Sequence, residues 1–206
     1  MLSKRVAIYG LSFISLFFSN SVTTVAQNKR ITAQQEAPLF TITDVNGTLT
    51  ELKQYRGRKV LLSFHRNVGC PICNLRFHEL EKLGAKYPEL TMLAVYESSV
   101  ANMKKYLDGQ QVHAVMIPDT TQALYELYHI ERSKGKIMKG MLHGAMGKMK
   151  AGNKLFTQKM KQDGNMDRIG ADFLIDEHGR VLIAHYDNYV GDHLPVSTIT
   201  AALDGQ

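Results

Sequence analysis

Two cysteines, three positions apart, stand between a strand-like run and a helix-like run, and no other feature constrains the fold as much. Residues 60–64 have strand character, and leucines then recur at helical spacing between residues 75 and 83. Cys70 and Cys73 are the only cysteines of the chain. A sulfur at the start of a helix lies beside unpaired N–H groups that favour its thiolate, and a second sulfur one turn later is close enough to form a disulfide with it. The pattern predicts an α/β domain with a dithiol redox centre.

Residues 1–26 have the three parts of a secretory signal peptide. Lys4-Arg5 is followed by a mostly apolar stretch over residues 6–18, and small residues up to Ala26 offer a cleavage site before Gln27. The apolar stretch is shorter than the about 20 residues that span a membrane, so an uncleaved anchor is the less favoured alternative. We therefore expect an exported protein, periplasmic in a cell with an outer membrane, without stable membrane association after cleavage.

The size and charge of the expected mature chain, residues 27–206, bear on how the cysteine pair is used. Such a chain is long enough for one domain with an adequate core, and a disulfide across two residues closes too short a loop to stabilise it much. We therefore expect a reactive pair rather than an inert disulfide or a metal site. The whole chain has 25 basic and 19 acidic residues, and removal of Lys4 and Arg5 lowers its net charge from +6 to +4, which does not suggest nucleic-acid binding.

Strand and helix patterns alternate along most of the chain. We expect residues 27–37 to be a flexible leader and residues 38–206 to form one domain, with a helical or irregular insertion at about residues 131–165. Strands are expected at residues 39–43, 48–52, 60–64, 91–96, 112–117, 171–176 and 181–186, and helices at 70–87, after Ser98 or Ser99, at 120–128 and at 195–203. A parallel start and a late antiparallel hairpin indicate an α/β fold with a mixed central sheet flanked by helices.

Three segments carry a resemblance to a known family. Residues 63–73 are similar to a Phe-x-Arg-x-x-Gly-Cys-x-x-Cys pattern, residues 170–181 to a penultimate hairpin strand, and residues 190–193 to a Phe-Gly-Asp-His segment. In this order they resemble the thioredoxin-fold superfamily, and within it the peroxiredoxin-like branch of the AhpC/TSA group, from about Pro38 to the C-terminus. The resemblance implies a thioredoxin-like fold and a thiol-dependent oxidoreductase with no cofactor and no metal.

The chemistry expected of the pair begins at Cys70. Its thiolate attacks either a peroxide, which leaves a sulfenic acid, or a protein disulfide, which leaves a mixed disulfide, and Cys73 resolves both. Both cycles end in one intramolecular disulfide that a thioredoxin-like electron donor must reduce. Peroxiredoxins have Pro-x-x-x-Thr-x-x-Cys before the attacking sulfur, whereas Ser63 and Asn67 stand here, so an amide replaces the hydroxyl that helps to position peroxide.

Further departures leave the substrate open. Gly170 stands where peroxiredoxins have an arginine, so Arg66 or Arg168 is expected to supply the positive charge beside the thiolate. Disulfide reductases carry a proline just before the same strand, and Ala171 or Asp172 occupies its place. We expect peroxide reduction first and thiol–disulfide exchange on exported proteins as the alternative, with Cys70, Cys73, Arg66 and Asn67 as the catalytic residues.

The insertion at residues 131–165 is rich in Lys, Gly and Met. Its methionines and His143, together with the cysteine pair, include soft ligands suited to Cu(I), so a copper-handling protein of thioredoxin fold is a third hypothesis. The simpler interpretation is a flexible lid, with methionines on its apolar side and lysines on its solvent face. Such a lid would cover the active site, and its lysines would alternatively form a basic surface for an acidic partner.

Three polar residues near the expected strand ends have possible roles in proton transfer or anchoring. His65 alternates with Phe64 and is expected to face the cysteines as a proton relay. Glu97 ends a central strand and is a candidate buried acid that handles protons for Cys73. His193 is expected to cap or anchor the last helix, and His78 is expected at the surface.

Overall fold

The computed structural model describes residues 30–108, 110–155 and 160–205, which form seven strands and six α-helices. The strands are β1 (Thr41–Thr43), β2 (Leu49–Glu51), β3 (Val60–Phe64), β4 (Thr91–Tyr96), β5 (Val115–Pro118), β6 (Ala171–Ile175) and β7 (Val181–Tyr186). The helices are α1 (Pro71–Lys86), α2 (Val100–Tyr106), α3 (Ala123–Leu127), α4 (Lys134–Leu142), α5 (Ala145–Leu155) and α6 (Val196–Leu203), with a 3-10 turn η1 (Leu52–Tyr55) after β2.

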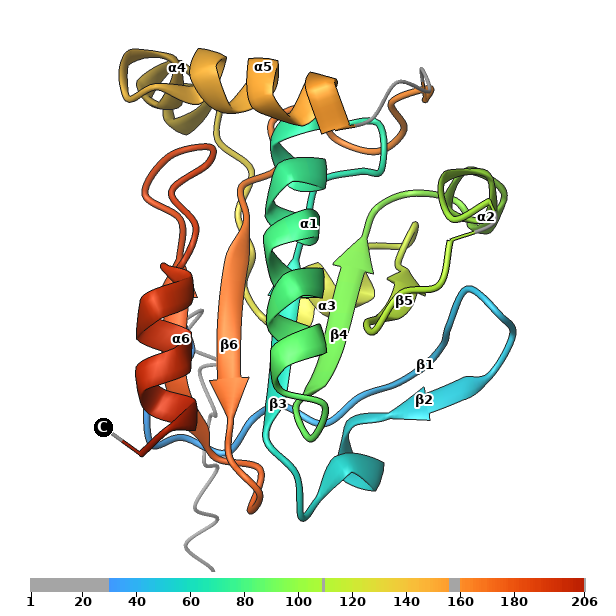
Figure 1. Cartoon of the computed structure of the whole chain (residues 1–206), viewed down its shortest axis with the longest axis vertical. Coiled ribbons are helices and arrows are strands. Elements are labelled where there is room, and N and C mark those ends of the chain that lie inside the picture. Colours follow the sequence, from blue (N-terminus) through green and yellow to red (C-terminus); the bar gives the residue numbers. More distant parts are fainter. Residues whose placement is uncertain (1–29, 109, 156–159, 206) are drawn as a thin grey trace, which may run out of the picture.

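Five strands form one mixed sheet with the order β5-β4-β3-β6-β7. The strands β3, β4 and β5 are parallel, and β6 runs antiparallel to both β3 and β7. A separate small sheet pairs β1 with β2. Helices α1 and α6 lie on one face of the large sheet and α3 lies on the other (Figure 1). The predicted mixed sheet flanked by helices is therefore confirmed.

The central strand β3 separates two apolar cores. All five of its residues are buried, as expected for a strand covered on both faces. Leu61 faces the core under α1 and α6, whereas Leu62 and Phe64 face the core under α3. This packing fixes the C-terminal end of β3, and therefore the loop that carries the first cysteine, between two rigid layers.

Residues 30–37 differ from the flexible leader that we expected. Ile31 and Ala37 are buried, and backbone hydrogen bonds join Gln34 to Val181 and Ala37 to Gly179. The segment forms a turn around Gln34 and an antiparallel bridge from Glu36 to Arg180, and it thus lies against the edge of the sheet at the start of β7. The sequence did not predict this packing for two reasons. The segment has too few apolar residues to show a spacing, and the strand that it contacts begins about 145 residues later in the chain.

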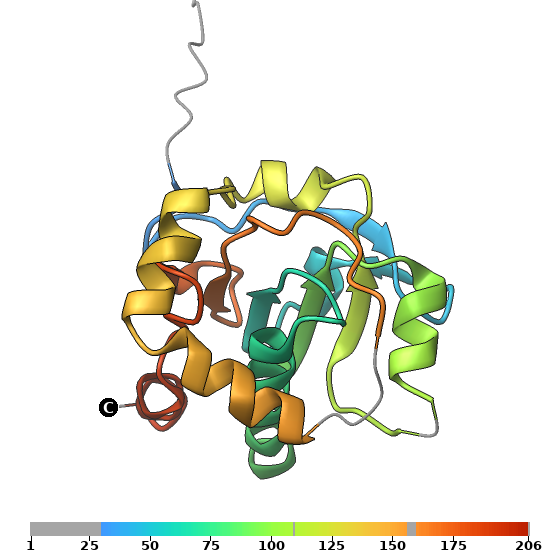
Figure 2. The ribbon, with the colours of Figure 1, turned by 90° about the horizontal axis from the view of Figure 1, so that it is seen from above.

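The insertion contains two helices that cross the top of the domain. Helices α4 and α5, which we call the lid, lie across one end of the domain, with α5 over the N-terminal end of α1 and α4 beside the loop after β7 (Figures 1 and 2). Gly140 of α4 lies against Val190 so closely that an added Cβ would be 2.4 Å from that valine's side chain. Lys148 of α5 donates a hydrogen bond of 2.6 Å to the carbonyl of Gly191. The lid is therefore fixed to the loop between β7 and α6.

The expected signal peptide, residues 1–26, and the cleavage site before Gln27 lie outside the described residues. Among the residues that the structure does describe, none of the helices is both long and apolar enough to cross a membrane.

Candidate active site

Cys70 occupies the N-cap of α1, directly after the loop that leaves β3. Its backbone is extended, and Pro71 takes the first helical position, where the missing N–H would have had no helical partner. The N–H of Cys73 donates to the Cys70 sulfur over 3.4 Å. The sulfur therefore takes the place that an oxygen takes in an ordinary N-cap, at the positive end of the helix dipole.

Arg66 supplies the positive charge beside this sulfur. Its Nη2 lies 3.0 Å from Cys70 Sγ, and its Nη1 donates over 2.8 Å to the carbonyl of Met166. The backbone N–H of Arg66 donates to Cys73 Sγ over 3.4 Å. One residue thus contacts both sulfurs and also holds the chain that returns from the lid. Of the two arginines expected from the sequence, this is the one beside the thiols.

The pKa values of the two thiols are driven apart. A hydrogen bond from the Cys73 thiol is the largest cause that lowers the pKa of Cys70 to about 6; burial opposes it, and the charge of Arg66 adds to it. The same hydrogen bond and then burial raise the pKa of Cys73 well above its usual range. At pH 7 the site therefore holds one thiolate and one thiol, which is the division of labour that a nucleophile and a resolving thiol require.

Asn67 lies in the loop between Arg66 and Cys70, and its side chain is fully buried. Its backbone carbonyl accepts a hydrogen bond from the N–H of Cys70. Neither the oxygen nor the nitrogen of its side-chain amide has a hydrogen-bond partner among the described residues. An unpaired buried amide is costly, so a buried donor group and a buried acceptor remain free three residues before the nucleophile.

Both sulfurs are buried under the lid. Cys70 has no exposed surface and Cys73 is 6% exposed. Gly152 of α5 lies directly on the start of α1, since an added Cβ there would be 1.9 Å from the carbonyl oxygen of Pro71. A Cβ on Gly69 would be 2.9 Å from the side chain of Gln162. Only glycine allows these two close approaches, and together they close the site to large molecules.

Residues 160–168, which we call the return segment, lead from the lid to β6 and are fixed to the sheet. The carboxylate of Asp163 accepts hydrogen bonds from Ser98 Oγ over 2.6 Å, from the N–H of Ser99 over 2.9 Å and from Asn102 Nδ2 over 2.7 Å. Ser98 Oγ also accepts from the N–H of Val68 in the cysteine loop. A movement of the return segment would therefore disturb the loop that carries the nucleophile.

Glu97 is buried, as the sequence suggested, but it serves the return segment. It pairs with Arg168 and accepts a hydrogen bond from the N–H of Asn165. Arg168 also donates to the carbonyl of Ile130 and lies over the ring of Tyr125. Glu97 and Arg168 therefore stabilise the return segment. Glu97 was expected to carry protons for Cys73, and Arg168 was one of two candidates for the charge beside Cys70; these contacts give both residues a structural role instead.

His65 faces a buried polar cluster rather than the sulfurs. Its Nε2 lies 3.1 Å from Ser63 Oγ, which donates over 2.6 Å to Asp172, and its ring stacks on Tyr96 at 4.6 Å. Burial lowers its pKa to about 3, so the ring is neutral at ordinary pH. Asp172 in turn pairs with Arg76 at 2.9 Å, with both side chains 2% exposed. The expected proton relay to the cysteines has no contact to support it.

The pair of Arg76 and Asp172 was missed in the sequence, although a signal was present. Arg76 lies on the same face of α1 as Ile72 and Leu80, which point into the core. Asp172 alternates with Leu174, which also points into that core. A charged residue at a core position of a helix and another at a core position of a strand predict each other as partners.

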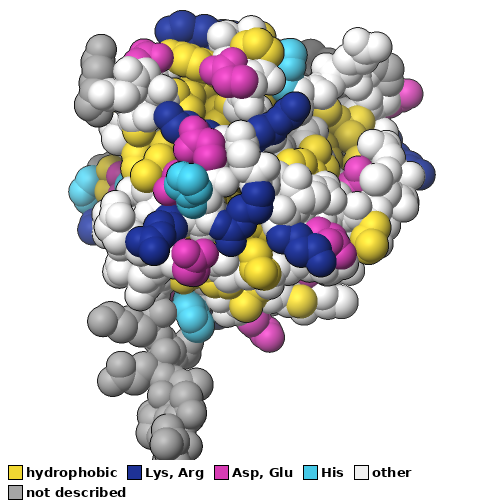
Figure 3. All heavy atoms as spheres, turned by 90° about the horizontal axis from the view of Figure 1, so that it is seen from below, with side chains coloured by type: hydrophobic (Ala, Val, Ile, Leu, Met, Phe, Trp, Pro, Cys, Tyr) yellow, Lys and Arg dark blue, Asp and Glu magenta, His cyan; other side chains and the backbone are white. Residues whose placement is uncertain are grey.

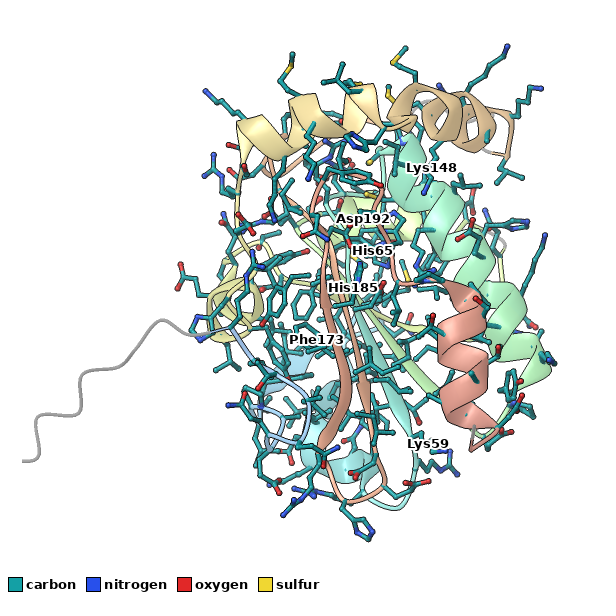
Figure 4. All side chains as sticks on the ribbon, turned by 90° about the vertical axis from the view of Figure 1, so that its left-hand side faces the viewer. Lys59, His65, Lys148, Phe173, His185 and Asp192 are labelled. Carbon is teal, nitrogen blue, oxygen red and sulfur yellow. The ribbon has the colours of Figure 1, made fainter. Side chains whose placement is uncertain are left out.

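The loop after β7 carries a second buried carboxylate, Asp187. His193 Nδ1 lies 3.1 Å and His185 Nε2 lies 3.4 Å from its oxygens. The hydrogen bond to Asp187 raises the pKa of His185 to about 9. His193 thus anchors the loop that precedes α6 and does not cap the helix, whose N-cap is Pro195. Figure 4 shows His65 and His185 in the interior below Lys148 of the lid.

A groove of about 540 Å³ opens beside the site, between the lid and the return segment. Its lining residues are Arg132, Lys134, Ile137, Met138, Met166 and Asp167. Arg66 links the groove to the thiol pair, because its side chain contacts Cys70 and also donates a hydrogen bond to the backbone of Met166, which lines the groove. Over the described part of the chain, His, Cys, Asp and Glu side chains form no group of three or more that could hold a metal ion.

A thioredoxin-like sheet with a thiolate and a thiol at the N-terminus of its first long helix defines a thiol-dependent oxidoreductase. The family model described as the AhpC/TSA family matches residues 33–183. The chain belongs to this family, as the resemblance in its sequence predicted.

Relatives and solved structures agree with this assignment. A Mycobacterium tuberculosis protein named a peroxiredoxin, MT2597, is 19% identical over 175 residues, which cover 82% of this chain and 94% of that protein. A thiol peroxidase from Chromobacterium violaceum has a TM-score of 0.62 at 12% identity and covers 86% of this chain and 88% of its own. A DsbE thiol:disulfide interchange protein from Chlorobium tepidum has a TM-score of 0.55 at 19% identity, with coverages of 86% and 95%. The thioredoxin-like fold is thus confirmed.

Proposed function

We propose that this protein is an exported peroxidase that reduces small peroxides through Cys70 and Cys73. Burial of the thiolate supports the proposal most directly. Cys70 has no exposed surface beneath α5 and the return segment. Water-sized hydrogen peroxide needs little space to approach it, whereas the disulfide of a folded protein would have to displace the lid. Export rests on the signal-peptide pattern of residues 1–26.

The reaction begins with the Cys70 thiolate attacking one peroxide oxygen. The O–O bond breaks, Cys70 becomes a sulfenic acid, and the second oxygen leaves with a proton as water or an alcohol. Arg66 stabilises the sulfur's negative charge before attack and offers N–H donors to the oxygens during it. The unpaired amide of Asn67 supplies a donor and an acceptor where peroxiredoxins have a hydroxyl.

Cys73 completes the first half of the cycle. Its thiol attacks the Cys70 sulfenic acid, a disulfide forms, and the hydroxyl leaves as water. Its raised pKa keeps the proton on Cys73 until then, so that it donates to Cys70 instead of competing with it for charge. Two electrons from an external dithiol, such as a thioredoxin-like protein, then reduce the disulfide by exchange.

The proposal is tested with the reduced full chain and one equivalent of hydrogen peroxide. We expect rapid loss of two thiols per chain, no rapid loss in Cys70→Ser, and much slower turnover with insulin disulfides as the substrate. Loss of thiols no faster than that of free glutathione would overturn the peroxidase. If insulin were reduced faster than peroxide, thiol–disulfide exchange, the alternative, would take its place.

A further inference from the structure

The lid exposes more large apolar side chains than any other part of the described structure. Met138 is 67% exposed, Leu142 is 86% exposed and Met146 is 62% exposed. Exposed apolar residues that cluster in this way mark an interaction surface, since scattered single ones are usual and clusters are not. The lid therefore packs against the domain with one face and presents an apolar interaction surface to the outside with the other.

Helical geometry separates these two faces. In α4, Ile137 and Gly140 pack inward and Met141 lies beside them, while Met138 and Leu142 lie on the outer side. In α5, the inner positions include Ala145, Met149 and Gly152, and the outer ones include Met146, Lys150 and Lys154. Figure 4 shows sulfur- and nitrogen-tipped side chains projecting outward from these two helices.

The charge of this surface has one sign. Helices α4 and α5 contain six lysines and no aspartate or glutamate (Lys134, Lys136, Lys139, Lys148, Lys150 and Lys154). Five of the lysines within α4 and α5 are exposed, whereas Lys136 is half-buried and pairs with Glu131. The face at the opposite end of the molecule has basic and acidic side chains interspersed (Figure 3). The positive potential is therefore concentrated on the lid.

We propose that the outer face of α4 and α5 docks the protein on an anionic lipid membrane. Lysines flanking long, flexible apolar side chains on a helix are what such a surface binds: the headgroups attract the ammonium groups, and the apolar side chains enter the boundary with the acyl chains. An acidic protein partner fits less well. Protein interfaces are enriched in aromatic residues, methionine and arginine and depleted in lysine, and α4 and α5 combine methionines with many lysines and contain no aromatic residue and no arginine.

Docking in this way gives the domain a defined orientation. The lid lies at one end of the molecule, with α5 over the N-terminal end of α1 (Figures 1 and 2). Its inner side covers Cys70 through the contact of Gly152 with Pro71. The proposal thus places the thiol pair on the side of the domain that faces the membrane, beneath α5.

Lysine footprinting tests the proposal residue by residue. The full chain is acetylated with and without phosphatidylglycerol vesicles at low salt, and modification is read by mass spectrometry. We expect severalfold protection of Lys139, Lys150 and Lys154 and none of the exposed Lys104 and Lys105 on α2. Neutral phosphatidylcholine vesicles should protect none of these lysines. Because the readout is local, binding through the N-terminal residues cannot imitate it.

Variants give a second readout by vesicle co-sedimentation. Replacement of Lys139, Lys150 and Lys154 by Gln together should weaken binding to phosphatidylglycerol vesicles about tenfold or more, and Leu142→Ser should weaken it about tenfold. The matched controls are Lys104→Gln with Lys105→Gln, and Leu49→Ser at a site that is 58% exposed. These should bind as the wild type does.

Three results would overturn the proposal. One is equal protection of the lid lysines and of Lys104, and another is binding that the lid variants leave unchanged. The third is protection of the lid lysines by soluble polyglutamate but not by vesicles, which would assign the surface to an acidic protein instead. Peroxidase activity does not enter any of these measurements, so the outcome is independent of the proposed function.

Discussion

Replacement of Arg66 by glutamine is the perturbation that most clearly separates the contributions to the Cys70 thiolate. Glutamine is shorter than arginine by two bonds, so it removes both the charge and the N–H donor that lie 3.0 Å from the sulfur while it keeps a polar side chain. An opposite charge at such a distance shifts a pKa by about 1–3 units. The hydrogen bond from Cys73 remains, so we expect the pKa of Cys70 to rise from about 6 to about 8.

This shift has a measurable consequence for the thiolate population at pH 7. A thiol with a pKa of about 6 is about nine-tenths ionised there, and one with a pKa of about 8 is about one-tenth ionised. Reaction with peroxide should slow at least about tenfold at pH 7, and at pH 10, where both thiols are ionised, only the loss of the N–H donors that Arg66 offers to the peroxide oxygens should remain. Arg66→Lys should lie between the wild type and Arg66→Gln, because an ammonium cannot bond Cys70 and Met166 at once.

The assay is the ultraviolet absorbance of the thiolate in the reduced protein, titrated against pH, with Cys70→Ser as the blank. This readout needs no reagent to reach a buried sulfur. Arg58→Gln, an exposed arginine on the loop before β3, controls for a general loss of positive charge. A pKa for Cys70 in Arg66→Gln that equals the wild-type value would refute the role given to the guanidinium.

Three further predictions concern the lid and the buried charges. Gly152→Ala should lift α5 from α1 and speed alkylation of Cys70 severalfold, whereas Gly147→Ala on the same helix, where an added Cβ meets nothing, should leave that rate unchanged; equal rates would contradict the packing. Arg76→Met should lower the free energy of unfolding in urea by about 3–5 kcal/mol because it strands Asp172 in the core, and Asp172→Asn added to it should recover part of the loss; a single variant as stable as wild type would be inconsistent with the pair. His185 has a pKa raised to about 9, so its charge stabilises the fold fully below pH 6.5 and this contribution is lost as pH rises through 9; wild type should lose about 1 kcal/mol more than His185→Gln between pH 6.5 and 10, and identical pH profiles would exclude the effect.

Much of the sheet could be predicted from the sequence because its strands are regular. The strands β3, β4 and β7 have the predicted bounds, and β6 ends one residue earlier than expected. Central strands read as continuous apolar runs bounded by turn residues, as around Gly179, whose φ of +81° suits the expected hairpin turn. The bounds of helix α1 were also predictable, because Pro71 takes its first position and Pro88 follows soon after its last residue.

The lid and the contacts of the site were less predictable. Helices α4 and α5 contain four glycines, and Gly144 lies in the turn that joins them. Such a composition favours loops, so their helical form depends on packing against α1 and the loop after β7. Arg66 was one of the two arginines expected to supply the charge beside Cys70, and the structure places it there. The pairing of Glu97 with Arg168 was not expected, because it depends on the return segment, which lies about 90–100 residues after the thiol loop.

The account's central claim is that a buried Cys70 thiolate reacts with peroxide and that Cys73 resolves the product. Mass spectrometry of the reduced Cys73→Ser protein after one equivalent of hydrogen peroxide tests this most directly. We predict the gain of one oxygen on Cys70, trapped by dimedone, where the wild type instead loses two hydrogens and forms the disulfide between Cys70 and Cys73. An unmodified Cys70 in that variant, with the wild type also unchanged, would contradict the claim.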